Sequence, residues 1–81
     1  MTKSEKNSII EWVKTLTNDE LKKECYKAIY KTIDTQIEEM RERGYSKQDI
    51  IERKKYEKYL NQKAELLEQL CYERGIKIWE M

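Results

Sequence analysis

Apolar residues recur at helical spacing along most of the chain and divide it into three stretches. Within each stretch most of them stand three, four or seven positions from another member, which places them on one face of an α-helix. The first stretch runs from about Ser4 to Leu16 and carries Ile9, Trp12, Val13 and Leu16. The second carries Leu21, Cys25, Ile29, Ile33, Ile37 and Met40, and the third carries Ile50, Tyr56, Leu60, Ala64, Leu67, Leu70 and Cys71.

The breaks between these stretches coincide with local stop and start signals. Thr17-Asn18-Asp19-Glu20 matches a capping box, in which a hydroxyl and a carboxylate three positions later satisfy each other's backbone amides. The same stretch is also compatible with an uninterrupted helix. Gly44 suits the left-handed position after a helix, and Ser46 is a second, weaker cap. Gly75 ends the third stretch, and the chain contains no proline.

These signals predict an all-α fold in one domain, residues 1–81. The expected helices cover about 4–16, 18–43 and 47–74, followed by a tail, 75–81. The two long helices are joined by about three residues, so they must run antiparallel. We expect a long antiparallel helical hairpin with a shorter N-terminal helix, assembling into a helical bundle.

The order of charges along the two long helices favours the same hairpin. Each helix begins basic and ends acidic, which opposes the helix macrodipole. A reversal near Tyr45 would bring Glu38 and Glu39 close to Arg53. It would likewise bring the early lysines of the second helix close to the late glutamates of the third. An antiparallel dimer would satisfy the same pattern.

Composition limits the classes of function. Charged residues make up 41% of the 81 residues, yet the net charge is only +1, which argues against a strongly cationic nucleic-acid arm. The regular apolar spacing argues against a disordered segment. No apolar run approaches the ~18–20 residues that span a bilayer, and the polar N-terminus lacks a secretory pattern, so we expect a cytoplasmic protein. A core this small favours a homodimer.

Catalytic chemistry has little support. Histidine is absent, and there is no glycine-rich phosphate loop or acidic cluster at metal spacing, so we predict no catalytic residue, cofactor or metal. Cys25 and Cys71 stand on apolar stripes and are expected to be buried free thiols. A disulfide, or a zinc site shared between two copies, is the alternative. No motif of a known family is recognised.

Two surfaces remain as candidates for binding. Trp12 and Trp79 lie at the chain ends, and tryptophan is enriched at binding hot spots. They could instead close the open end of the hairpin. We predict that Trp12, Ile76, Ile78 and Trp79 contact a protein partner, which makes the chain a small regulatory, inhibitory or adaptor protein.

The alternative is a nucleic-acid-binding regulator. Residues 41–63 contain eight basic and four acidic residues, and interleaved tyrosines could stack on bases. The residues expected to bind nucleic acid in this alternative are Arg53, Lys54, Lys55 and Lys58.

Overall fold

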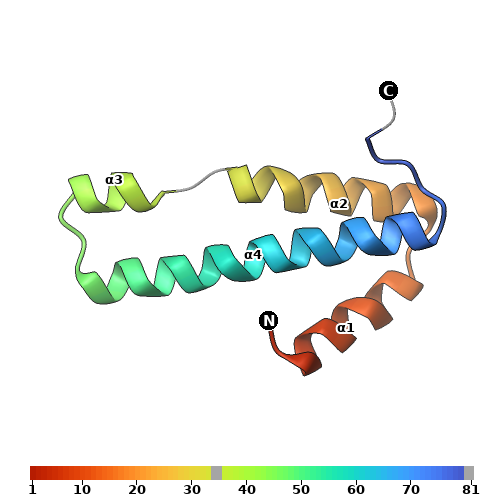
Figure 1. Cartoon of the computed structure of the whole chain (residues 1–81), viewed down its shortest axis with the longest axis horizontal. Helices are drawn as coiled ribbons and strands as arrows, with labels where there is room; N and C mark the ends of the chain where they lie inside the picture. The colour runs from red at the N-terminus through yellow and green to blue at the C-terminus, as the bar shows by residue number, and fades with distance from the viewer. Residues whose placement is uncertain (34–35, 80–81) are drawn as a thin grey trace.

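The computed structural model describes residues 1–33 and 36–79, and these residues form an all-α hairpin. Its helices are α1 (Lys3–Lys14), α2 (Asn18–Ile33), α3 (Ile37–Glu42) and α4 (Lys47–Glu73); this part of the chain contains no strand. Figure 1 shows α2 and α3 running antiparallel to α4, with α1 beside the C-terminal half of α4. The predicted fold class, a hairpin with a shorter N-terminal helix, is confirmed.

The predicted capping signals start two of the helices. The Thr17 hydroxyl accepts the Glu20 backbone N–H at 3.2 Å, and the Thr17 N–H donates to Glu20 Oε1 at 3.0 Å. The Ser46 hydroxyl accepts the Asp49 N–H at 3.2 Å. Each bond satisfies a backbone donor that has no partner within its helix. The chain therefore breaks at Thr17, and the uninterrupted helix is wrong.

The two glycines end helices as expected. Gly44 and Gly75 have φ values of +79° and +78°, a region in which a side chain is strained. The following amides reach back five residues: Tyr45 N–H donates to the Met40 carbonyl at 3.0 Å, and Ile76 N–H to that of Cys71 at 2.9 Å. This is the Schellman pattern of helix ends.

The predicted helix over 18–43 is interrupted, so that expectation is wrong. Its first part ends at Ile33, Gln36 has non-helical backbone angles (φ −114°, ψ 5°), and α3 begins at Ile37; residues 34–35 lie outside the described residues. Thr32 and Ile33 are β-branched and have low helix propensity. Ile33 is also 71% exposed, so no packing offsets that cost.

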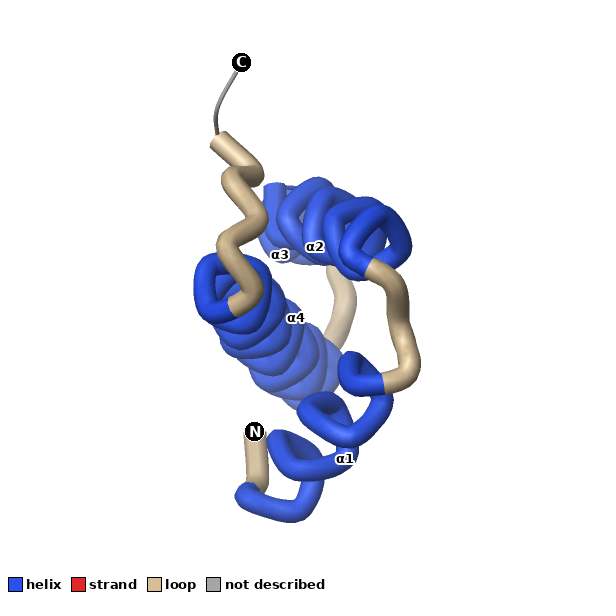
Figure 2. Tube along the Cα trace, turned by 90° about the vertical axis from the view of Figure 1, so that its right-hand side faces the viewer, coloured by secondary structure: helices blue, strands red, loops and turns tan. Residues whose placement is uncertain are grey.

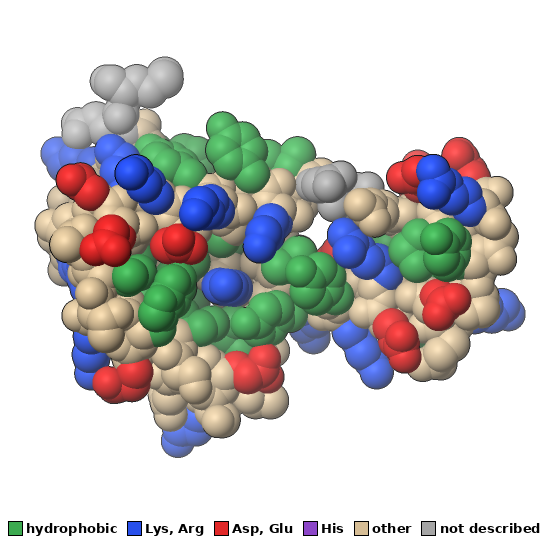
Figure 3. Space-filling view, turned by 180° about the vertical axis from the view of Figure 1, so that it is seen from behind, with side chains coloured by type: hydrophobic (Ala, Val, Ile, Leu, Met, Phe, Trp, Pro, Cys, Tyr) green, Lys and Arg blue, Asp and Glu red, His purple; other side chains and the backbone are tan. Residues whose placement is uncertain are grey.

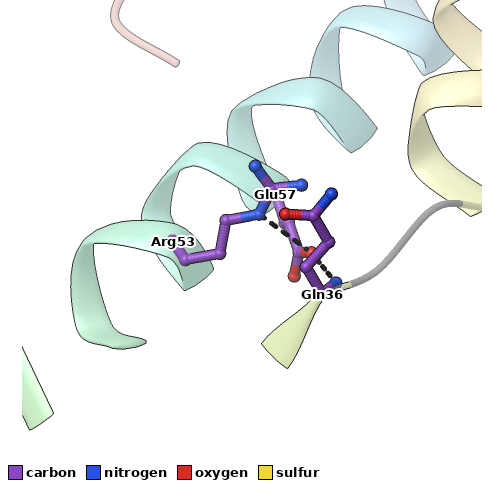
Figure 4. Close-up of polar contacts among 3 residues, drawn as sticks. All are labelled: Gln36, Arg53 and Glu57. Atoms are coloured by element: carbon purple, nitrogen blue, oxygen red, sulfur yellow. Dashed lines mark hydrogen bonds and ion pairs between the residues drawn. The ribbon is translucent and has the colours of Figure 1, made fainter. Parts of the chain in front are cut away.

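A carboxylate of α4 holds the chain where α3 begins. The Gln36 N–H donates to Glu57 Oε1 at 3.3 Å, and Arg53 Nε approaches the same oxygen at 3.4 Å (Figure 4). The side chain of Glu57 thus supplies a tertiary contact at the break. The local sequence around the break does not predict this contact, because Glu57 belongs to another helix.

The hydrophobic core lies at one end of the hairpin. Leu21 and Cys25 of α2 and Leu67 and Cys71 of α4 are completely buried. Around them are the other members of the buried cluster: Ile9, Val13, Ala28, Ala64, Leu66 and Ile78. We call this region, residues 1–28 and 60–79, the packed end.

The other half of the hairpin contributes no buried residue. We call residues 36–59 the tip; every one of them is exposed or half-buried. The Cα atoms span 45 × 32 × 14 Å, and Figure 2 shows α4 between α2 and α1. The radius of gyration is 15.0 Å, against about 12 Å for a compact domain of this length.

Hydrogen bonds from Arg74 link α1 to the end of α4. Its guanidinium donates to the carbonyl oxygens of Val13 at 2.7 Å and Leu16 at 2.8 Å, and to Asn18 Oδ1 at 3.3 Å. Val13 lies in the last turn of α1 and Leu16 just after it, so one side chain at the end of α4 fixes the corner between α1 and α2.

The predicted ion pairs between the long helices do not form among the residues that the structure describes. Glu39 pairs with Arg43 at 2.7 Å, and Arg53 with Glu57 at 3.4 Å, each within one helical turn. The hairpin is therefore held by its apolar seam, and the charge order does not fix it.

Substitutions of buried and of exposed apolar residues are expected to differ strongly in cost. Leu67→Ala removes a fully buried side chain and should lower the free energy of unfolding by about 2–5 kcal/mol. Ile33→Ala should change it by no more than about 0.5 kcal/mol, because Ile33 is largely in water. Urea unfolding followed by circular dichroism measures both. Equal losses in the two variants would contradict a core confined to the packed end.

Candidate functional site

The C-terminal tail is fixed to the packed end by one buried side chain and one hydrogen bond. Ile78 is 3% exposed and belongs to the core, and its carbonyl accepts the Tyr26 hydroxyl at 2.6 Å. Ile76 packs against the core and is half-buried. The side chain of Ile78 therefore anchors the tail, and its contact with a partner stays a prediction.

Trp79 stands at the surface on this anchored backbone. It is 58% exposed, and its indole Nε1–H donates to Glu68 Oε1 at 2.9 Å. The Tyr72 hydroxyl donates to the same oxygen at 3.3 Å, and Tyr72 is 51% exposed. Partial desolvation and the nearby Glu68 charge raise the pKa of Tyr72, so the phenol keeps its proton as donor. We call Glu68, Tyr72 and Trp79 the aromatic patch.

Trp12 lies elsewhere. Its ring is 37% exposed, and the Lys63 ammonium lies 5.7 Å from the ring centroid, a cation–π contact. In Figure 2 the tail rises past α2, whereas α1 lies on the other side of α4. The four residues predicted to contact a partner thus do not form one surface: Trp79 and Trp12 are exposed at separate places, Ile76 is half-buried and Ile78 is buried.

Sequence reasoning missed the other two members of the patch. Glu68 and Tyr72 stand four positions apart, a spacing that brings side chains together on a helix, so that pair was detectable. Trp79 joins them only because Ile78 and Tyr26 turn the tail back along α4. This is a tertiary arrangement, and no spacing in the sequence encodes it directly.

The basic segment is only partly free to bind an anion. Arg53 contacts Glu57, and its guanidinium lies 5.2 Å from the centroid of the Tyr56 ring; the Arg53 side chain is only 23% exposed. The remaining three candidates, Lys54, Lys55 and Lys58, are exposed on α4. In the structure three of the four predicted residues, the lysines, are therefore exposed, whereas the arginine contacts Glu57 and Tyr56.

The cysteines are buried free thiols, as expected. Cys25 and Cys71 have no exposed surface and form no disulfide. Burial raises the pKa of Cys25 to about 12, with a further contribution from Cys71, and burial also raises the pKa of Cys71. A raised pKa disfavours the thiolate that a metal or an electrophile requires. Across residues 1–33 and 36–79, no three potential metal-ligating side chains gather.

One cleft, of about 340 Å³, lies between the start of α1 and the C-terminal half of α4, beside Met1, Lys6, Gln62 and Leu66. Its lining also includes Thr2 and a single carboxylate, Glu65, and contains no thiol.

Comparison of the chain with protein-family models, with curated proteins and with solved structures finds no match in any of the three. In the part of the chain that the structure describes, no helix combines the length and apolar character needed to cross a membrane. The case for a function therefore depends on the surface of this molecule.

The thiols are expected to make stability depend on pH only in the alkaline range. A group whose pKa is raised by folding stabilises the fold fully below its unfolded pKa, about 8.5 for a thiol, and loses this contribution as pH rises through the folded value. The free energy of unfolding of the wild type should therefore fall between pH 8.5 and 12 more steeply than that of Cys25→Ala.

Thiol titration with Ellman's reagent at pH 8 provides the control. Native protein should react far more slowly than protein in urea, because both sulfurs are buried. Rapid reaction of the native thiols, or equal alkaline slopes in wild type and Cys25→Ala, would show that the cysteines are not core residues.

Proposed function

We propose that this protein is a small non-catalytic regulatory, inhibitory or adaptor protein that acts by protein–protein contact. The contact surface is the aromatic patch at the packed end. The setting is the cytoplasm, and the acting species is a homodimer. The observation that carries the proposal is the fixed, exposed pair of Tyr72 and Trp79 around Glu68.

The chemistry of the patch supports a protein partner. Tryptophan and tyrosine bury large areas on binding and lose little side-chain entropy, and they are enriched among the residues that dominate binding energy. Trp79 and Tyr72 together present two rings that are more than half exposed. Isolated exposed apolar residues are ordinary, but two aromatic rings held by one carboxylate form a defined surface.

The way the tail is held supports the same conclusion. Ile78 and Tyr26 fix the backbone on one side of Trp79, and Glu68 fixes its indole. A side chain that is already ordered before binding loses less entropy when the partner docks. The patch is thus a preorganised contact, in contrast to a flexible recognition tail.

Removing the rings of the patch should abolish partner capture without unfolding the chain. We expect tagged Trp79→Ala/Tyr72→Ala protein to lose at least tenfold of the partner that wild type retains, because hot-spot truncations each cost about 2 kcal/mol or more. Quantitative mass spectrometry of cross-linked captures from a native lysate measures the ratio. Circular dichroism should show unchanged helicity.

Trp12→Ala is the matched control, because it removes an exposed tryptophan outside the patch. It should capture the same proteins as wild type. The proposal fails if the Trp79/Tyr72 variant captures the same proteins at wild-type levels, or if Trp12→Ala loses the same proteins as that variant.

The nucleic-acid alternative retains one favourable observation, the three exposed lysines Lys54, Lys55 and Lys58. Against it, Arg53 is engaged by Glu57 and Tyr56, and acidic side chains interrupt the segment. We expect no retention of single- or double-stranded oligonucleotides by fluorescence anisotropy at low salt. Binding that falls steeply between about 50 and 200 mM salt, and that disappears in Lys54→Glu/Lys58→Glu, would favour the alternative.

A further inference from the structure

The tip carries apolar side chains that the single chain does not bury. Seven apolar residues lie between positions 36 and 59, and all of them are exposed or half-buried: Ile37, Met40, Tyr45, Ile50, Ile51, Tyr56 and Tyr59. Figure 3 shows the tip as a separate lobe with its own group of hydrophobic side chains, apart from the larger group over the packed end. They have the helical spacing of core residues, but the single chain buries none of them.

No third helix of the described residues covers this half of the hairpin. At the packed end α1 lies beside α4 and contributes Ile9 and Val13 to the core. Among residues 1–33 and 36–79, only α3 and the first half of α4 lie at the tip. Stable helical architectures bury apolar faces between at least two layers. The tip has one layer and therefore lacks its counterpart.

The two helices of the tip have opposite charge. Within α3 three carboxylates, Glu38, Glu39 and Glu42, accompany one cation, Arg41. The α4 segment 47–59 has five cations and three carboxylates: Lys47, Arg53, Lys54, Lys55 and Lys58 against Asp49, Glu52 and Glu57. Glu38, Glu42, Lys54 and Lys58 form no ion pair with another described residue, so their charges remain to be matched.

We propose that the tips of two copies pair about a two-fold axis, with α3 of each copy against the first half of α4 of the other. The acidic helix of each copy then faces the basic segment of its partner, and this contact occurs twice, as two-fold symmetry requires. The apolar residues of the two tips become the inside of a four-helix bundle. The inference rests on the homodimer of the proposed function and assigns its interface.

A second copy fits this surface better than a partner of one charge sign. Any strongly acidic surface would meet the carboxylates of α3, and any strongly basic one would meet the lysines of α4. Only a surface that is itself acidic on one helix and basic on the next complements both, and the tip has this pattern. The pairing also leaves both aromatic patches uncovered, because they lie at the packed ends, so that the dimer can bind two partners.

The test is charge reversal in two complementary variants, measured by sedimentation equilibrium from micromolar to millimolar protein. Wild type should form a particle of twice the 10.0 kDa chain mass. Glu38→Lys/Glu42→Lys makes both helices of the tip basic, and Lys54→Glu/Lys58→Glu makes both acidic. Each alone should weaken the dimer by at least about tenfold, because four exposed ion pairs become like-charge contacts. An equimolar mixture should restore wild-type affinity as a heterodimer.

Lys3→Glu/Lys6→Glu is the matched control, since it makes an equal charge change on exposed positions of α1. It should dimerise like wild type. The inference is overturned if wild type is monomeric throughout, if the tip variants dimerise normally, or if the mixture fails to associate. These outcomes are independent of partner capture through Trp79 and Tyr72. A monomeric wild type would remove the homodimer from the proposed function, whereas protein contact through the aromatic patch is tested by the capture experiment alone.

Discussion

The short apolar seam between α2 and α4 is the interaction on which the rest of the molecule depends. Leu21 and Cys25 meet Leu67 and Cys71 with no exposed surface, and the remaining buried side chains gather around them. Because this seam lies at one end, α1 and the C-terminal tail can be added to it, through Arg74 and Ile78 respectively. The same concentration of apolar contacts leaves the tip without a core.

The sequence predicts those parts of the fold that depend on neighbouring residues. Thr17, Ser46, Gly44 and Gly75 act within one turn of themselves, and each behaves as its local pattern indicates. The break at Gln36 was missed for the opposite reason. A four-residue apolar spacing through Ile33 predicts a continuous helix. Such a helix is stabilised only where a partner helix buries its apolar residues, and in the single chain Ile33 is not buried.

In the candidate site, too, some features follow from the local sequence and others depend on tertiary contacts. Exposed tryptophans at the chain ends were predictable from composition, whereas the aromatic patch requires the tail to turn back along α4 and bring Trp79 to Glu68. The burial of Ile78 was not predictable, because alternating apolar residues in a short tail look alike whether they face a core or a partner. The charge order was also misread: it resembles an intramolecular match, but the described pairs lie within single helices. The molecule therefore has two surfaces of different character: the preorganised aromatic patch at the packed end, and the apolar side chains of the tip that the single chain does not bury.

Amide hydrogen exchange along α4 in dilute solution tests most directly that the core occupies one end only. Exchange protection reports the free energy of local opening, which depends on the buried contacts of each segment. In the monomer, amides from Leu60 to Cys71 should exchange only with global unfolding, and those from Lys47 to Tyr59 should exchange orders of magnitude faster. Uniform protection along the whole of α4 in the monomer would contradict the division of the hairpin into a packed end and an open tip.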